Sequence, residues 1–93
     1  MSLSEVRKEI ADQPITRLLA ARLTAERGET DGAVVQLDAL AGSVKGVWKE
    51  MAAIEAILIL KAAGRNEDAG VRADRFRTEF GQSALLAEVE TLA

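Results

Sequence analysis

The sequence predicts an all-α protein, and three observations lead to this fold class. Apolar residues recur at spacings of three and four through most of the chain, which is the period of an α-helix with one buried face. Hydrophobic residues make up 48% of the composition but include only three aromatics, so Ala, Leu, Ile and Val must build most of the core. Proline, which breaks helix interiors, occurs once in 93 residues. This length accommodates one domain, 1–93, with about five helices.

The first two predicted helices meet at Pro14. Alternation of apolar and charged residues predicts a short amphipathic helix over 3–12. Pro14 suits the first turn of the next helix, because the N–H that proline lacks would have no partner there. This second helix is expected over 14–27, and Gly28 supplies the left-handed conformation that commonly ends a helix. The apolar residues of the first helix are Leu3, Val6 and Ile10.

Glycines delimit the remaining helices. A helix from Thr30, expected as its cap, to about Ala41 is followed by a break that Gly42 and Gly46 mark. The next stretch is apolar on nearly every side, which predicts a central buried helix. Gly64 ends it. This central helix is expected from Val44 or Val47 to Ala63, followed by a half-exposed helix over 66–80 capped by Asn66 and a last helix over 83–93 capped by Ser83.

Residue types that the chain lacks narrow its function. It has no cysteine, which excludes disulfides and thiol chemistry, and no histidine, which is the commonest metal ligand and general base. The acidic pairs Glu29/Asp31 and Glu67/Asp68 lie at helix starts, where the helix dipole accounts for them. We therefore expect no enzyme, no metal site and no cofactor.

Charge and hydropathy bear on two further classes of partner. A net charge of −3, with Lys and Arg scattered among Asp and Glu, lacks the basic stripe of a nucleic-acid-binding protein. No apolar run approaches the ~18 residues of a membrane span, and charges stand where a secretion signal needs apolar residues. We expect a cytoplasmic location for the chain as given, and a periplasmic or membrane-anchored one if it is a fragment of a larger protein.

The chain carries an internal repeat of 36 residues. A shift by this period places Gly28 on Gly64 and Ala33 on Ala69, so that a glycine at a helix end is followed five residues later by an alanine. A helix-turn-helix unit with a period of about 34 residues is typical of an α-solenoid. The two predicted units span 14–42 and 44–81, and three further pairs coincide: Ala20 with Ala56, Val35 with Val71 and Asp38 with Asp74.

These units resemble the tetratricopeptide repeat family, whose unit carries a small residue in its first helix, a glycine in the turn and an alanine early in its second helix. The matching stretches are Ala21 with Gly28-Glu-Thr-Asp-Gly-Ala33, and Ala56 with Gly64-Arg-Asn-Glu-Asp-Ala69. The sequence departs from the family at Arg17 and Ala53, where a large aromatic is expected, and lacks the proline between units. Because such arrays need ~3 units, the helices over 3–12 and 83–93 are expected to act as caps.

The resemblance implies a concave binding groove lined by the first helix of each unit. Carried over residue by residue, the lining is Ile15, Leu18, Arg22 and Glu26 in unit 1, and Met51, Ile54, Leu58 and Lys61 in unit 2. In this interpretation Trp48 is a binding anchor, and Arg22 and Lys61 orient the partner. The alternative is that the apolar residues belong to the core, that Trp48 closes the core and that both cations are solvated.

Three functions follow from these features. The first is a non-catalytic interaction module or scaffold of bacterial type, which binds a peptide or a partner helix through the concave face. The second is a structural homo-oligomer, such as a homodimer, in which the apolar helix over 44–63 packs against its own copy. The third, a helix-turn-helix regulator, requires 66–80 as a basic recognition helix. The arginines of that helix are instead expected to pair with acidic neighbours: Arg72, Arg75 and Arg77 with Asp68, Asp74 and Glu79.

Overall fold

A computed structural model of the chain describes residues 13–83, 85–87 and 89, which form four continuous helices and no strand. The all-α prediction is confirmed. The helix predicted over 3–12 lies outside the described residues, as do residues 84, 88 and 90–93 of the last predicted helix. The four helices are α2 (Pro14–Glu26), α3 (Thr30–Ser43), α4 (Val47–Ala62) and α5 (Asn66–Glu79).

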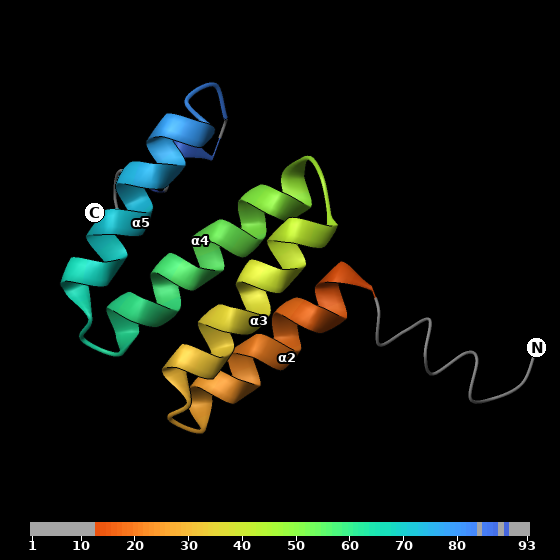
Figure 1. Cartoon of the computed structure of the whole chain (residues 1–93), viewed down its shortest axis with the longest axis vertical. Coiled ribbons are helices and arrows are strands. Elements are labelled where there is room, and N and C mark those ends of the chain that lie inside the picture. The colour runs from red at the N-terminus through yellow and green to blue at the C-terminus, as the bar shows by residue number, and fades with distance from the viewer. Residues whose placement is uncertain (1–12, 84, 88, 90–93) are drawn as a thin grey trace, which may run out of the picture.

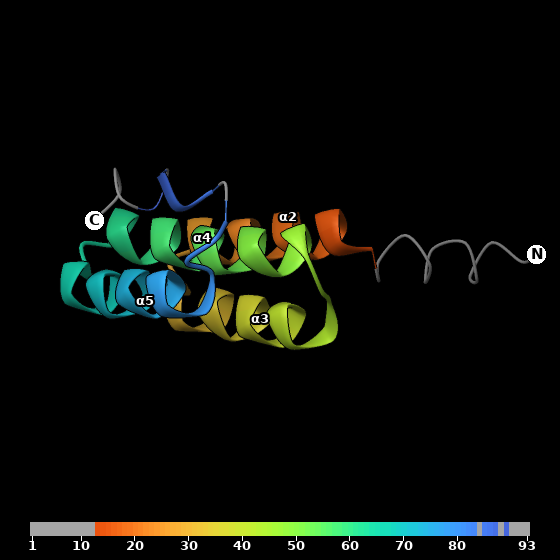
Figure 2. The same ribbon diagram turned by 90° about the horizontal axis from the view of Figure 1, so that it is seen from above.

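Successive helices run antiparallel and lie in two layers. Figure 1 shows α2 and α4 running in one direction and α3 and α5 in the other. Seen from above, α2 and α4 share one layer and α3 and α5 share the second (Figure 2). The helix α3 packs against α2 and α4, α5 packs against α4, and α2 also contacts α4. The parallel and neighbouring placement of α2 and α4 is the one that the sequence repeat predicts.

The turns after α2 and α4 have the same structure, 36 residues apart. Gly28 and Gly64 have φ angles of +86° and +79°, which confirms their predicted left-handed conformation. In the first turn, the N–H of Gly28 donates to Ala25 O at 2.9 Å, and the N–H of the next residue donates to Thr24 O at 3.2 Å. The second turn repeats both bonds, to Lys61 O at 3.0 Å and to Leu60 O at 2.9 Å. This pattern is the Schellman motif, which satisfies the last carbonyls of a helix.

The predicted caps at Thr30 and Asn66 are wrong. Both are the first residues of their helices, while Glu29 and Arg65 occupy the cap positions without a side-chain cap hydrogen bond. The reason is the tight turn: the residue after the glycine closes one helix with its N–H and begins the next one at once. By contrast, the Oγ of Ser83 accepts a hydrogen bond from Leu85 N at 3.0 Å, as expected of a cap.

The break between the two units lies later than predicted. The helix α3 continues through Gly42 to Ser43, and the chain turns at Gly46, which has a φ of +68°. Ser43 is held in this last turn, because its Oγ donates to Leu40 O at 2.9 Å and accepts from Arg17 Nη1 at 2.8 Å. Of the two glycines that predicted the break between the units, only Gly46 has the positive φ that glycine tolerates, so Gly42 did not mark the end of the helix.

The core lies between the two layers and draws on all four helices. The helix α4 contributes most, with six buried residues, as predicted for a central helix, although Val47, Met51 and Leu58 are exposed on one side of it. Ala33 and Ala69, matched by the repeat, are both buried, whereas Ala20 is exposed and its counterpart Ala56 is buried. Ala20 and Ala56 therefore coincide in the sequence repeat but do not occupy equivalent places in the core. The buried residues are Leu18, Ala21, Ala33, Val34, Leu37, Leu40, Ala52, Ile54, Ala56, Ile57, Ile59, Leu60, Ala69, Ala73, Phe76 and Val89.

Candidate functional site

A groove of about 480 Å³ runs along the line where α2 meets α4. We call it the α2/α4 groove. Its walls come from the C-terminal halves of both helices and from the turn after α2, which brings Gly28 and Thr30 to its end. Three of the residues predicted to line a groove are found in it: Arg22, Glu26 and Leu58.

Arg22 and Glu55 form a fixed ion pair in this groove. The Nε and Nη2 atoms of Arg22 donate to the two carboxylate oxygens of Glu55 at 2.8 and 3.1 Å. Hydrogen bonding to Glu55 raises the pKa of Arg22, and the attraction between the two charges adds to this effect. The side chain of Arg22 remains 55% exposed, against 13% for Glu55. The guanidinium therefore has a carboxylate partner within the chain and still faces solvent.

The other predicted site residues divide by burial. Leu18 and Ile54 are only 5% and 8% exposed, which leaves little of either side chain for a partner. Met51 and Leu58 are 37% and 39% exposed. Trp48 is partly buried and packs against the core, and Lys61 is exposed. For Leu18 and Ile54, then, the core alternative describes their place in the structure.

Exposed apolar side chains are concentrated on the layer of α2 and α4. Among the described residues, six of the eight large hydrophobics that are exposed belong to these two helices. Their spacings of four and seven place them on one face of each helix. Only Val35 and Val71 belong to the other layer. The six are Ile15, Leu19 and Leu23 on α2 and Val47, Met51 and Leu58 on α4.

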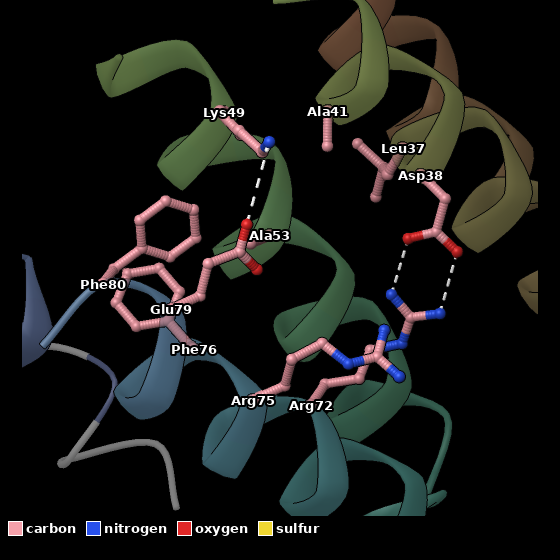
Figure 3. Close-up of a pocket in the computed structure, with 10 residues that line it drawn as sticks. All are labelled: Leu37, Asp38, Ala41, Lys49, Ala53, Arg72, Arg75, Phe76, Glu79 and Phe80. Carbon is pink, nitrogen blue, oxygen red and sulfur yellow. Dashed lines mark hydrogen bonds and ion pairs between the residues drawn. The ribbon is translucent and has the colours of Figure 1, made fainter. Parts of the chain in front are cut away.

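A second concave site, which the sequence did not predict, lies between α3, α4 and α5 (Figure 3). We call it the α3/α5 cavity, and its volume is about 130 Å³. Apolar residues form its floor, and charged residues stand at its rim. The floor comprises Leu37, Ala41, Ala53, Phe76 and Phe80, and the rim comprises Asp38, Lys49, Arg72, Arg75 and Glu79.

Both carboxylates at this rim are paired. Arg72 binds Asp38 with two parallel hydrogen bonds of 2.6 and 2.9 Å, and Lys49 Nζ lies 3.7 Å from Glu79 Oε1. The hydrogen bonds from Arg72 lower the pKa of Asp38, and the positive charge of Arg75 lowers it further. The same bonds raise the pKa of Arg72. In the view of Figure 3, the side chains of Arg72 and Arg75 both extend from α5 toward α3 at the rim.

The pairing predicted for the arginines of α5 is confirmed for Arg77, which binds Asp74, and differs for Arg72. The partner of Arg72 is Asp38 in the other unit, Asp68 is bound by Arg65, and Arg77 pairs with Asp74 within the helix. Arg65 also reaches Asp31 in α3. The sequence-based prediction considered only ion pairs between residues of the same helix. The signal that was missed is a separation close to the repeat period: Asp31–Arg65 and Asp38–Arg72 are each 34 residues apart.

The described residues lack the features of two further classes of site. They contain no group of three or more acidic, histidine or cysteine side chains placed to hold a metal ion. None of their helices is both long and apolar enough to cross a membrane. Concave features of the described residues include the α2/α4 groove, the α3/α5 cavity and a hollow between α3 and α5 lined by ion pairs.

Comparison of the chain with protein-family models, with curated proteins and with solved structures finds no match.

Proposed function

We propose that the protein is a non-catalytic interaction module, which binds a peptide or an amphipathic partner helix along the α2/α4 groove. The observation that carries this proposal is that six exposed large hydrophobics belong to the two helices that form the groove, and that one of them, Leu58, lines it. Exposed apolar side chains that gather on one part of a surface are typical of interaction sites. The resemblance of both units to tetratricopeptide repeats, where first helices line the groove, supports the same assignment.

The groove suits an apolar helix face more than a charged ligand. Met51 and Leu58 follow one line along α4, and a partner helix presents apolar residues at matching spacings of three, four and seven. Arg22 is already neutralised by Glu55, so it offers orientation more than net charge. We assign Arg22 and Lys61 to positioning the partner, and Met51 and Leu58 to burying its apolar side chains.

The test combines site-specific crosslinking with a matched charge substitution. A photoreactive residue at Met51 should capture a discrete partner in cells, while the same residue at Val35, on the opposite layer, should not. Binding of the captured partner should then be abolished by Leu58→Asp and retained by Val35→Asp, which introduces the same charge at an exposed residue of the other layer. Equal capture at both positions, or unfolding of Leu58→Asp by circular dichroism, contradicts the groove assignment.

A second candidate is a homodimer through the same face of α4. The observation in its favour is that Val47, Met51 and Leu58 are exposed on one side of the most apolar helix. Light scattering at micromolar concentration distinguishes the two functions. A dimer that Leu58→Asp dissociates and Val35→Asp preserves supports self-association, whereas a monomer leaves the groove to another protein.

A helix-turn-helix regulator is the weakest of the candidates. Its recognition helix is α5, and the carboxylates of Asp38 and Asp74 neutralise two of the arginines that phosphate binding requires.

A further inference from the structure

The α3/α5 cavity has the size of a single ring. Its volume of about 130 Å³ is close to the ~150 Å³ of an engineered apolar cavity that binds benzene. Phe76 and Phe80 meet in its floor, with ring centroids 4.9 Å apart and planes inclined at 48°. Phe76 is only 2% exposed, so the partly buried ring of Phe80 is the surface against which a third aromatic group can pack. The floor therefore favours an aromatic side chain.

The rim carries one cation more than its carboxylates neutralise. Asp38 is bound by Arg72, and Glu79 is paired with Lys49. Arg75 makes no hydrogen bond or ion pair with another described residue, although it lines the cavity. The rim thus has three cations and two anions, and its third cation is the one that is available to a ligand.

We propose that the α3/α5 cavity binds an acidic peptide through one aromatic anchor, whose ring enters the cavity while a neighbouring carboxylate pairs with Arg75. Charge complementarity selects the acidic residue, and the size and aromatic floor of the cavity select the anchor. A buried aromatic anchor beside an arginine is the composition of an interface hot spot. Free phosphate fits less well, because it leaves the apolar floor empty and finds only one unpaired cation.

This site is separate from the α2/α4 groove. It lies in the second layer, between α3 and α5 and over α4, and none of its lining residues lines that groove. The protein would then hold two segments of partner chain at once, or one partner that wraps around α4. Failure of the groove proposal leaves this one standing, because the two are tested with different residues.

The experiment is an NMR titration of the full chain with acetyl-Glu-Phe-Glu-amide. The backbone amides around Ala41, Ala53 and Phe80 should shift at millimolar peptide. Acetyl-Glu-Ala-Glu-amide, without the ring, should leave them unchanged, and acetyl-Gln-Phe-Gln-amide should bind about tenfold more weakly, since it loses the charged hydrogen bond. Inorganic phosphate at the same concentration should produce no shift there.

Two substitutions complete the test. Arg75→Gln should weaken the peptide about tenfold, while Arg27→Gln, which makes the same change in net charge at an exposed residue after α2, should have no effect. Ala53→Leu fills the cavity and should abolish binding with the fold retained by circular dichroism. Equal binding by the Arg75 and Arg27 variants, equal binding of the alanine peptide, shifts confined to the α2/α4 groove, or no shift at all would overturn the proposal.

Discussion

The two layers of the molecule are joined across the repeat in different ways. In the first layer, α2 and α4 are in direct contact, and the Arg22–Glu55 pair lies at the surface of their seam beside apolar residues such as Ala25 and Ile59. In the second layer, the backbones of α3 and α5 do not meet, and the ion pairs Asp38–Arg72 and Asp31–Arg65 span the gap. Buried apolar contacts therefore join α2 to α4, whereas ion pairs between side chains connect α3 to α5.

The attachment of α5, the second helix of the second unit, depends on packing more than on these ion pairs. Exposed ion pairs contribute only about 0–1 kcal/mol each, so α5 must be held mainly by its packing on α4. Its buried residues are Ala69, Ala73 and Phe76, of which only Phe76 is large. The α3/α5 seam is consequently the weaker one.

The largest expected effect comes from Phe76→Ala, which removes the one large side chain that fixes α5. We expect a loss of about 3–5 kcal/mol in the free energy of unfolding, because Phe76 is only 2% exposed. Urea denaturation followed by circular dichroism measures it. Phe80→Ala, at the partly buried ring beside it, should cost clearly less. Equal losses of unfolding free energy for Phe76→Ala and Phe80→Ala would show that Phe80 belongs to the core as fully as Phe76 does.

The next largest effect compares the two equivalent turns. Gly28→Ala and Gly64→Ala should each cost about 1–2 kcal/mol, because an L-residue is strained at positive φ although no atom lies near the added methyl group. Gly70→Ala, inside α5 and equally free of neighbours, should stabilise by about 0.5–1 kcal/mol through helix propensity. Thermal unfolding of the three variants measures these signs. A D-alanine at position 64, introduced by chemical synthesis, should cost nothing; a cost there would mean that strain is not the cause.

A smaller effect is expected from the ion pair across the α3/α5 seam. Asp38→Asn should cost about 0.2–1 kcal/mol at pH 7 and low salt. The pKa of Asp38 is lowered in the folded state, first by its hydrogen bonds from Arg72, so its contribution is present above the unfolded pKa of about 3.9 and is lost as pH falls through the folded pKa.

Urea denaturation of Asp38→Asn and of the parent chain between pH 7 and pH 2 should therefore show curves that converge at the acid end. Asp74→Asn is the matched control, since Asp74 occupies the same place in the repeat but pairs only with Arg77 of its own helix. A gap between the parent and Asp38→Asn that persists at pH 2 would contradict the electrostatic origin of the effect.

Sequence signals that act within a few residues predicted the helices well, but they predicted the contacts between helices poorly. The positions of Pro14, Gly28 and Gly64 follow from backbone chemistry that each residue carries with it, and they were found from the sequence. The burial of Leu18 and Ile54 depends on which neighbour covers a helix face, and helical spacing alone does not decide this. The partner of Arg72 lies 34 residues away, so that a search within one helix could not find it. The α3/α5 cavity was missed for the same reason, since three helices build it.

The smallest effect on stability should come from Val35→Asp and Val71→Asp. These valines occupy equivalent places in the repeat and are 66% and 57% exposed on the second layer. Each substitution should change the free energy of unfolding by less than about 0.5 kcal/mol, as surface changes usually do. Urea denaturation of both variants beside Met51→Asp and Leu58→Asp sharpens the comparison of the layers. If all four variants keep the stability of the parent chain but only Met51→Asp and Leu58→Asp lose partner binding, the exposed apolar face of α4 serves binding. If Met51→Asp and Leu58→Asp alone lose stability, that face belongs to the core.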